Sequence, residues 1–340
     1  MLKQRKSIVG LDIGTSCIKA VEITQEKYDF VISGYSQVEL PDEQSRHDAV
    51  AELFRAGNFR TKRVATAVSG KSVIFRYITM VDVPPDRLQQ AVRFEADKYI
   101  PFDVSEVELD AQKLSSSTGE GGKTEAKVLL AAAKRTVVDD HARMLIDIGL
   151  QPVCVGIDGF ALGNAYELAD VVNPGVREGG RTVALIDIGA TKSSINILRN
   201  NVSCFAREVP MGGDDLTQAI TRRVGIDTTA AESLKRDPGE QLSIVQEAVA
   251  QVLEDVGNEI NLSFDFFENQ FDGEVHDVLL TGGAVLLPFL EESLEKIFEK
   301  RTRVWNPIEG LKVKSDNVDV EALNQFAPQL AVAVGLAAGV

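Results

Sequence analysis

Residues 9–16 read VGLDIGTS, and residues 184–191 read ALIDIGAT. In both copies an apolar run ends in Asp-Ile-Gly, a turn of small or hydroxyl residues follows, and a second apolar run begins, at 18–23 and 194–198. The pattern predicts two β-hairpins with tight glycine turns. One such hairpin is a weak signal, whereas two in one chain indicate an internally duplicated α/β fold with a cleft between its halves.

The hairpin turns have the composition of an anion-binding site. Glycine lets a ligand approach the backbone, and the successive N–H groups of a turn form a cradle for negative charge. Two such turns would hold a polyphosphate from both sides, with phosphate contacts expected from Thr15, Ser16 and Thr191. The alternative is that these residues simply form the turns.

Two aspartates and one lysine accompany the turns. Asp12 and Asp187 end the first strand of each hairpin, where a carboxylate would hold Mg²⁺ or its bound waters. A surface carboxylate in a turn is the plainer interpretation, and the repetition favours the metal. Lys19, in the strand after the first turn, is expected either to reach a phosphate oxygen or to be solvated.

A third glycine turn, TGGA at 281–284, follows an apolar strand expected at 275–280. A glycine pair at the end of a strand and before a helix suits the close approach of a ligand, here to Gly282 and Gly283. An ordinary β-turn is the alternative.

Composition argues against several classes of function. The 340 residues carry a formal net charge of −15, which argues against non-specific binding of nucleic acid. The chain holds three cysteines, without a CxxC pair, and three histidines. This small set argues against a disulfide framework, a zinc site or Ser/His catalysis.

Membrane insertion is not expected. No signal peptide and no apolar window of about 18 residues is recognisable, so a cytoplasmic location is expected. The apolar end, 329–340, is predicted to be a core helix packed under a glycine turn, because it lacks the basic face of a helix that lies on a membrane.

Segment 84–152 is expected to be a small α+β insert. Pro84-Pro85 interrupts regular structure, a helix is expected from about 86 to 99, and Pro101 stops it. The stretch 115–124 is expected to be a polar loop at a hairpin tip.

The three glycine turns resemble, in order and spacing, the phosphate-1, phosphate-2 and adenosine motifs of the actin/Hsp70/sugar-kinase ATPase superfamily. Residues 231–235, AESLK, look like the Ala-Glu-x-x-Lys helix that bacterial actins place against ribose and adenine, and 211–214, MGGD, look like the turn before it. The resemblance implies that Glu232 and Lys235 contact nucleotide. At their i, i+3 spacing a surface ion pair is the alternative.

Within that superfamily the chain is most similar to the PilM family of type IV pilus assembly, which is related to the division protein FtsA. The opening 10–14 with 18–22, the stretch 210–214 and the end 331–339 carry this similarity, and EADKYIPF at 95–102 is its most distinctive signature. The resemblance covers essentially the whole chain. It implies a bilobed, duplicated actin-like (RNase H-like) α/β fold with a small α+β insert.

The resemblance also implies a division into subdomains. The insert would be subdomain 1C, in place of the 1B subdomain of actin. The implied ranges are 1A at 1–83 and 153–180, 1C at 84–152, 2A at 181–215 and 275–340, the latter returning to 1A, and 2B at 216–274.

In function, the resemblance implies a cytoplasmic scaffold that binds ATP and Mg²⁺, the metal at Asp12 and Asp187. The residues implied for the nucleotide are Gly14, Thr15, Ser16, Lys19, Gly189, Ala190, Thr191, Gly212, Gly213, Glu232, Lys235, Gly282 and Gly283. No catalytic residue is identified, and hydrolysis is expected to be slow or absent.

The implied partner is the N-terminal peptide of a PilN-like inner-membrane protein, bound in a groove between 1A and 1C. Tyr99, Ile100 and Phe102 are expected to bind it, although ordinary hydrophobic anchoring explains these residues equally well. The partner would recruit the protein to the inner-membrane face, without direct insertion, next to other pilus assembly proteins. Formation of a homo-oligomer stays open.

Two other functions also stay open. An FtsA-like division ATPase would share the fold, but FtsA ends in an amphipathic membrane helix that is not recognisable here. A small-molecule kinase would place an acidic base in the cleft, and no candidate for that base is evident.

Overall fold

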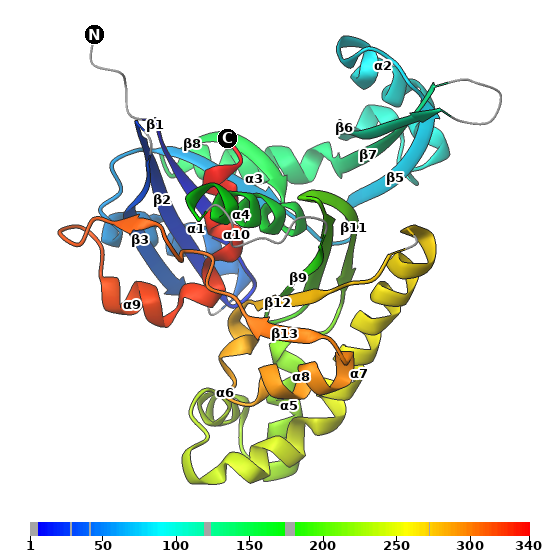
Figure 1. Cartoon of the computed structure of the whole chain (residues 1–340). Helices are drawn as coiled ribbons and strands as arrows, with labels where there is room; N and C mark the ends of the chain where they lie inside the picture. Colours follow the sequence, from blue (N-terminus) through cyan, green and yellow to red (C-terminus); the bar gives the residue numbers. More distant parts are fainter. Residues whose placement is uncertain (1–5, 28, 41, 119–123, 174–180, 272) are drawn as a thin grey trace.

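The computed structural model describes residues 6–27, 29–40, 42–118, 124–173, 181–271 and 273–340. Within this part of the chain the strands form three sheets, of six, five and three strands. Figure 1 shows the two larger sheets in two lobes and the smallest sheet set apart from both.

The strand order of the sheets is as follows. The first sheet holds β14 (Lys312–Val313), β3 (Asp29–Glu39), β2 (Cys17–Glu26), β1 (Lys6–Ile13), β4 (Arg63–Val68) and β8 (Gln151–Ile157). The second holds β11 (Val202–Val209), β10 (Ser193–Arg199), β9 (Thr182–Ile188), β12 (Asp277–Thr281) and β13 (Arg301–Val304). The third holds β5 (Val73–Val81), β7 (Thr124–Lys134) and β6 (Val107–Thr118).

The two larger sheets repeat one another. In the first, β2 lies antiparallel between β1 and β3, and β1 runs parallel to β4. In the second, β10 lies antiparallel between β9 and β11, and β9 runs parallel to β12. The duplicated, bilobed actin-like α/β architecture expected from the two Asp-Ile-Gly hairpins is therefore confirmed.

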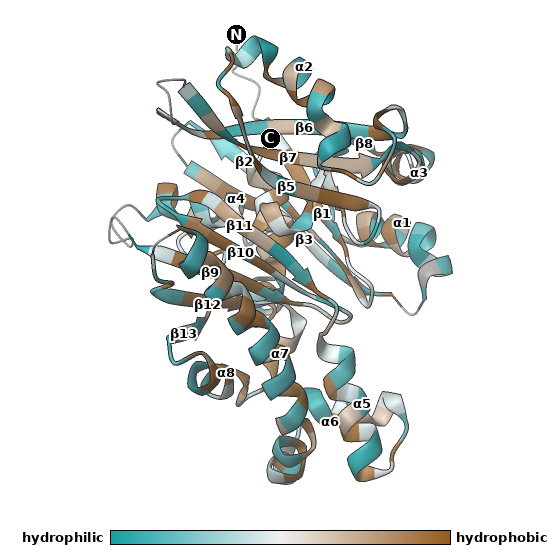
Figure 2. Ribbon diagram, turned by 90° about the vertical axis from the view of Figure 1, so that its right-hand side faces the viewer, coloured by the Kyte–Doolittle hydropathy of each residue, from teal (hydrophilic) through white to brown (hydrophobic). Residues whose placement is uncertain are grey.

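Helices cover the sheets on both sides. The helices are α1 (Arg46–Ala56), α2 (Pro85–Glu95), α3 (Arg135–Asp147), α4 (Asp158–Val172), α5 (Gly213–Val224), α6 (Thr228–Arg236), α7 (Leu242–Phe271), α8 (Leu290–Phe298), α9 (Val320–Gln325) and α10 (Ala331–Ala338). Apolar residues of α4 and α10 form one core with residues of both larger sheets. Helices α5, α7 and α8 pack on the second sheet around another core. Figure 2 shows α7 alternating between hydrophilic and hydrophobic stretches, as expected of a helix with one buried face.

The C-terminal helix α10 confirms the core helix predicted for the apolar end. It packs so closely on β1 that a Cβ at Gly10 would lie 2.7 Å from the amide nitrogen of Ala337. Residues from Ala331 to Ala337 are buried. Among the described residues, no helix combines the length and the apolarity needed to cross a bilayer.

The insert differs from its predicted bounds. Strand β5 pairs along its length with β7, so the third sheet begins at Val73 rather than after residue 84. Helix α3, expected inside the insert, instead places Leu145 in the core beneath β1 and β4. Both differences arise because strand pairing and helix packing join segments far apart in the sequence, which local composition does not record.

One local prediction in the insert is confirmed and another was wrong. Helix α2 ends at Glu95, and a 3₁₀ turn over Ala96–Lys98 continues the helical segment to just before Tyr99, as expected. Strand β6 continues to Thr118, where a loop was expected, since pairing with β7 outweighs the polar composition. The expected hairpin tip then falls on 119–123, outside the described residues.

Candidate functional site

The two hairpin turns meet although they lie 176 residues apart in the sequence. The Oγ1 atoms of Thr15 and Thr191 are 3.3 Å apart. Each turn is closed by the same backbone bond, from Gly14 N–H to the Cys17 carbonyl at 3.1 Å and from Gly189 N–H to the Lys192 carbonyl at 2.9 Å. The duplicated motif thus places two glycine turns side by side at the junction of the lobes.

Asp12 and Lys19 form a shielded ion pair beside the first turn. They are cross-strand partners in the β1–β2 hairpin, and the Lys19 Nζ lies 2.6 Å from Asp12 Oδ2. Burial alone would lower the pKa of the Lys19 ammonium, but the Asp12 carboxylate outweighs it and raises that pKa above its ordinary value. Lys19 is therefore not the solvated strand residue that the sequence left open.

Asp187 occupies the corresponding place beside the second turn. The Thr281 hydroxyl donates to its Oδ1 at 3.1 Å. Burial raises the pKa of Asp187 to about 6; Lys19 opposes the shift, while Asp12 and Asp158 add to it. Because these groups act on Asp187 electrostatically, both hairpin aspartates belong to one charged cluster.

Asp158 is a site residue that the sequence reasoning missed. It begins α4 directly after β8, and Lys192 joins it, at 2.7 Å, to Glu208, at 2.6 Å. Strand β8 runs parallel to β4, and β4 runs parallel to β1. Asp158 and Asp12 therefore both lie at the carboxyl end of these parallel strands. An acidic residue at the carboxyl end of an apolar strand was the signal available in the sequence.

The turn at 211–214 is attached to the second hairpin by its backbone. The N–H of Gly213 donates to the Gly189 carbonyl, and that of Asp214 to the Ala190 carbonyl, both at 2.8 Å. A Cβ at Gly212 would lie 2.6 Å from each of these carbonyl oxygens. A larger residue at 212 would therefore separate α5 from the second turn.

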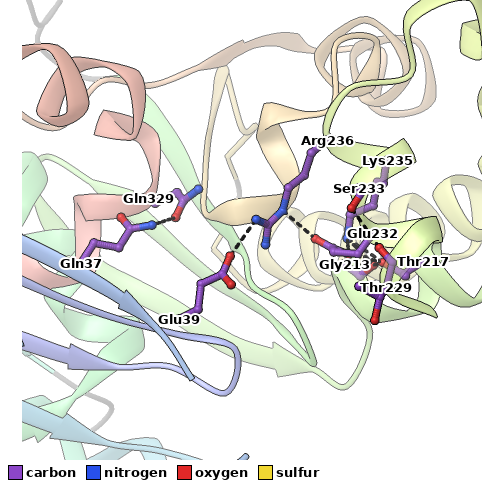
Figure 3. Close-up of polar contacts among 10 residues, drawn as sticks. All are labelled: Gln37, Glu39, Gly213, Thr217, Thr229, Glu232, Ser233, Lys235, Arg236 and Gln329. Atoms are coloured by element: carbon purple, nitrogen blue, oxygen red, sulfur yellow. Dashed lines mark hydrogen bonds and ion pairs between the residues drawn. The ribbon is translucent and has the colours of Figure 1, made fainter. Parts of the chain in front are cut away.

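Helix α6 brings Glu232 and Lys235 to the same place (Figure 3). The Lys235 Nζ donates to the Gly213 carbonyl at 3.0 Å and lies 2.6 Å from Glu232 Oε2. Burial would raise the pKa of Glu232, but hydrogen bonds from Lys235 and Thr217 hold it below its ordinary value. Lys235 is 8 % exposed, so the alternative of a plain surface ion pair is wrong for this lysine.

One ion pair crosses between the lobes at the end of α6. Arg236 lies between Glu39 on β3, at 2.9 Å, and Glu232, at 3.1 Å (Figure 3). The side chains of Arg236 and Glu39 are 61 % and 74 % exposed, so their pairing contributes little stability. It nevertheless joins the helix that carries Lys235 to the end of β3, where Glu39 is the cross-strand partner of Cys17 at the first turn.

The third glycine turn also reaches Asp187. Gly282 has φ +97°, and a Cβ there would lie 2.8 Å from Asp187 Oδ1, so this position requires glycine. At Gly283 a Cβ would meet no atom within 4 Å. The turn therefore combines one glycine packed against Asp187 with one that borders open space.

The residues predicted to bind the partner peptide lie in the domain that the third sheet forms with α2, which we call the third sheet's domain. This domain is apart from the charged cluster around Asp12 and Asp187. Ile100 is 6 % exposed and belongs to the core of that domain. Tyr99 and Phe102 pack against the same core but stay partly exposed, and Lys134 Nζ lies 5.0 Å from the centroid of the Phe102 ring. Phe94 on α2, which the sequence analysis did not single out, is 89 % exposed.

The donor set fits Mg²⁺ bound together with phosphates. Among the described residues, no group of three or more acidic, histidine or cysteine side chains could hold a metal alone. Mg²⁺ prefers one or two carboxylates, with phosphate and water oxygens completing its shell. Asp187 and Asp12 beside two N–H turns meet that preference.

Two comparisons with known proteins indicate the same family. A family model described as type IV pilus assembly protein PilM matches residues 10–339. The solved structure of a PilM–PilN type IV pilus biogenesis complex has a chain 29 % identical in sequence, with TM-score 0.84 and 97 % of both chains covered.

More distant relatives agree with the fold. The ethanolamine utilization protein EutJ from Carboxydothermus hydrogenoformans is 16 % identical, with TM-score 0.57, and the match covers 98 % of this chain and 89 % of EutJ. The cell division protein FtsA of Streptococcus pneumoniae serotype 2 (strain D39 / NCTC 7466) is 25 % identical over 232 residues, which is 62 % of this chain and 49 % of FtsA. The chain spans about half the length of the curated relatives it matches.

Proposed function

The chain belongs to the PilM family of type IV pilus assembly proteins, and on this premise we propose that it is an ATP-binding scaffold that also binds the N-terminal peptide of a PilN-like membrane protein. The observation that carries the nucleotide half is the meeting of Thr15 with Thr191, which brings two glycine turns together. The observation that carries the peptide half is the similarity to the chain in a PilM–PilN complex.

In this proposal the triphosphate lies between the two hairpin turns. The N–H groups of residues 14–16 and 189–191 bind its oxygens, as turns of this kind do with anions. Asp12 and Asp187 hold Mg²⁺ or its waters, and the metal supplies positive charge that balances the phosphates. Lys19, already paired with Asp12, adds a second positive charge on the same side.

The base and sugar lie toward α6. Glu232 is positioned by Lys235 and Thr217, so its carboxylate is fixed in place for a ribose hydroxyl. Lys235 holds the turn at Gly213 against α6 and thereby positions the floor of the site. Gly283, which borders open space, leaves room for the nucleotide beside the second sheet.

The proposal places the protein in the cytoplasm, attached to the inner membrane through its partner and next to other pilus assembly proteins. It keeps the division into 1A, 1C, 2A and 2B, with 1C beginning at β5 and ending with β7. The experiment that tests both halves is calorimetric titration of the whole chain, first with Mg·ATP and then with a synthetic N-terminal peptide of the PilN-like protein. Saturable binding of both ligands is expected, and failure to bind either one contradicts that half of the proposal.

Tyr99→Ala and Phe102→Ala are expected to weaken binding of that peptide by about tenfold or more, because each removes an apolar surface worth about 1.5–3 kcal/mol when buried. Both residues keep partly exposed surface on the third sheet's domain. Calorimetry with the synthetic peptide is the measurement, and affinity for Mg·ATP should not change.

Phe94→Ala is the matched control, since Phe94 is an exposed aromatic residue of the same domain. Its peptide affinity should equal that of the unmodified protein. Peptide affinity that drops for Phe94→Ala and is retained in the other two variants would move the partner site to the exposed face of α2.

A further inference from the structure

A cavity of about 790 Å³ lies between the third sheet and the second lobe. Residues 73–79 of β5 line one side, residues 204–208 of β11 line the other, and Phe266, Gln270 and Phe271 of α7 contribute as well. We call it the edge groove. None of the residues assigned above to the nucleotide, the metal or the partner peptide lines it.

The groove lies between two sheet edges that have no further strand partner among the described residues. In that part of the chain β5 is the last strand of its sheet and pairs with β7, and β11 is the last strand of the second sheet and pairs with β10. Successive residues of a strand point to opposite faces, so a cavity lined by seven consecutive residues of β5 lies along its edge. The Tyr77 hydroxyl and Ser203 Oγ, 2.9 Å apart, join the two edges at one point.

Such edges expose rows of N–H and C=O groups that accept an additional strand. Proteins commonly blunt their edges with proline, with several charges or by keeping the edge strand short. β5 and β11 are nine and eight residues long and contain no proline. Their backbones are therefore suited to pairing with an extended segment.

The side chains around the groove are aromatic and apolar. The rings of Phe205 and Phe266 lie 5.3 Å apart, and Phe266 is 53 % exposed. Phe271 and Val202 extend this surface. Apolar side chains at alternate positions of an added strand would be buried against it.

The charged side chains of the groove are mainly basic, on a chain whose net charge is −15. Arg207 is paired with Glu259, and Glu208 is paired with Lys192. Arg76, Lys127 and Arg199 also line the groove, and among the described residues none of them has a carboxylate partner. Arg199 instead donates to the Phe271 carbonyl, and Lys127 lies 5.0 Å from the centroid of the Phe271 ring.

We propose that the edge groove binds an extended segment of a protein partner as an added β-strand, in which apolar residues alternate with carboxylates. The apolar residues face the aromatic surface, and the carboxylates pair with Arg76, Lys127 and Arg199. This docking surface is separate from the nucleotide site and from the surface at Tyr99 and Phe102.

The test uses fluorescence anisotropy of a labelled heptapeptide in which Val and Glu alternate. The whole chain is expected to bind it saturably, and to bind the matched Val/Lys peptide at least about tenfold more weakly, because charge complementarity selects the partner. A Val/Glu peptide with a central proline should also bind weakly, since proline removes a backbone donor.

Arg76→Glu and Lys127→Glu change exposed side chains, so folding should be preserved. Each is expected to weaken binding of the Val/Glu peptide at least about tenfold, with unchanged affinity for Mg·ATP. Lys98→Glu, an exposed lysine of the same domain outside the groove, is the control and should bind the peptide normally.

Four results would overturn the proposal. The first is equal binding of the Val/Glu and Val/Lys peptides, and the second is normal binding of the Val/Glu peptide by both groove variants. The third is preference for an oligothymidylate probe over the Val/Glu peptide, which would mean a nucleic-acid surface. The fourth is a dimer that Arg76→Glu dissociates and that the Val/Glu peptide does not disrupt, which would mean that a second copy occupies the groove.

Discussion

Replacing Asp187 by asparagine is expected to lower the affinity for Mg·ATP by about tenfold or more, and to leave the fold intact. Mg²⁺ binding relies on carboxylate charge, which asparagine lacks, while the amide oxygen can still accept the hydrogen bond from Thr281. Burial raises the pKa of Asp187 to about 6, so its charged form is disfavoured in the folded chain. Removing that charge should therefore keep or raise the melting temperature at neutral pH.

Asp277→Asn provides the matched control for this variant. Asp277 begins β12 in the same sheet and pairs with Arg181, at the opposite end of the strand from Thr281. Calorimetric titration with Mg·ATP should give the control the affinity of the unmodified protein. If Asp187→Asn also retains that affinity, the second hairpin does not hold the metal.

The second large effect is expected at the third glycine turn. Substitution of Gly282 should lower thermal stability, whereas substitution of the adjacent Gly283 should not. Gly282→Ala puts a Cβ 2.7 Å from the Ile188 carbonyl carbon and 2.8 Å from Asp187 Oδ1, at φ +97°. A strained backbone position of this kind costs about 1–3 kcal/mol, and the clash adds to it. Gly282→Ala should therefore lower the melting temperature clearly, and ATP affinity with it.

Gly283→Ala should leave stability nearly unchanged, because its Cβ meets no atom within 4 Å. Its ATP affinity should nevertheless fall, since we assign that open space to the nucleotide. Thermal unfolding and calorimetry on both variants separate the two effects. A Gly283→Ala variant with normal ATP affinity would remove the third turn from the nucleotide site, and a Gly282→Ala variant of normal stability would contradict the packing against Asp187.

The sequence allowed the two-lobed fold to be predicted because the decisive information is local and repeated. The Asp-Ile-Gly motifs place glycine where the chain reverses direction, and both hairpins form where the motif predicts them. The predicted C-terminal core helix also forms, because its apolar residues have no polar face to present to water. In each of these cases a few consecutive residues determine the structure.

The remaining features depend on which segments meet in space. The sequence of β5 predicts a strand, and only its pairing with β7 assigns that strand to the third sheet. Asp158, Lys192 and Glu208 come from three elements, and no spacing in the sequence relates them. Ile100 lies in a distinctive stretch of sequence, and its burial in the core of that domain follows from contacts with distant segments.

The most direct test of the central claim is a crystal structure of the whole chain with Mg²⁺ and a non-hydrolysable ATP analogue. We predict that the triphosphate lies between residues 14–16 and 189–191, with the metal beside Asp187 and the ribose beside Glu232. A nucleotide bound elsewhere, or turns left empty at saturating analogue, would contradict the claim that the duplicated hairpins form one ATP site.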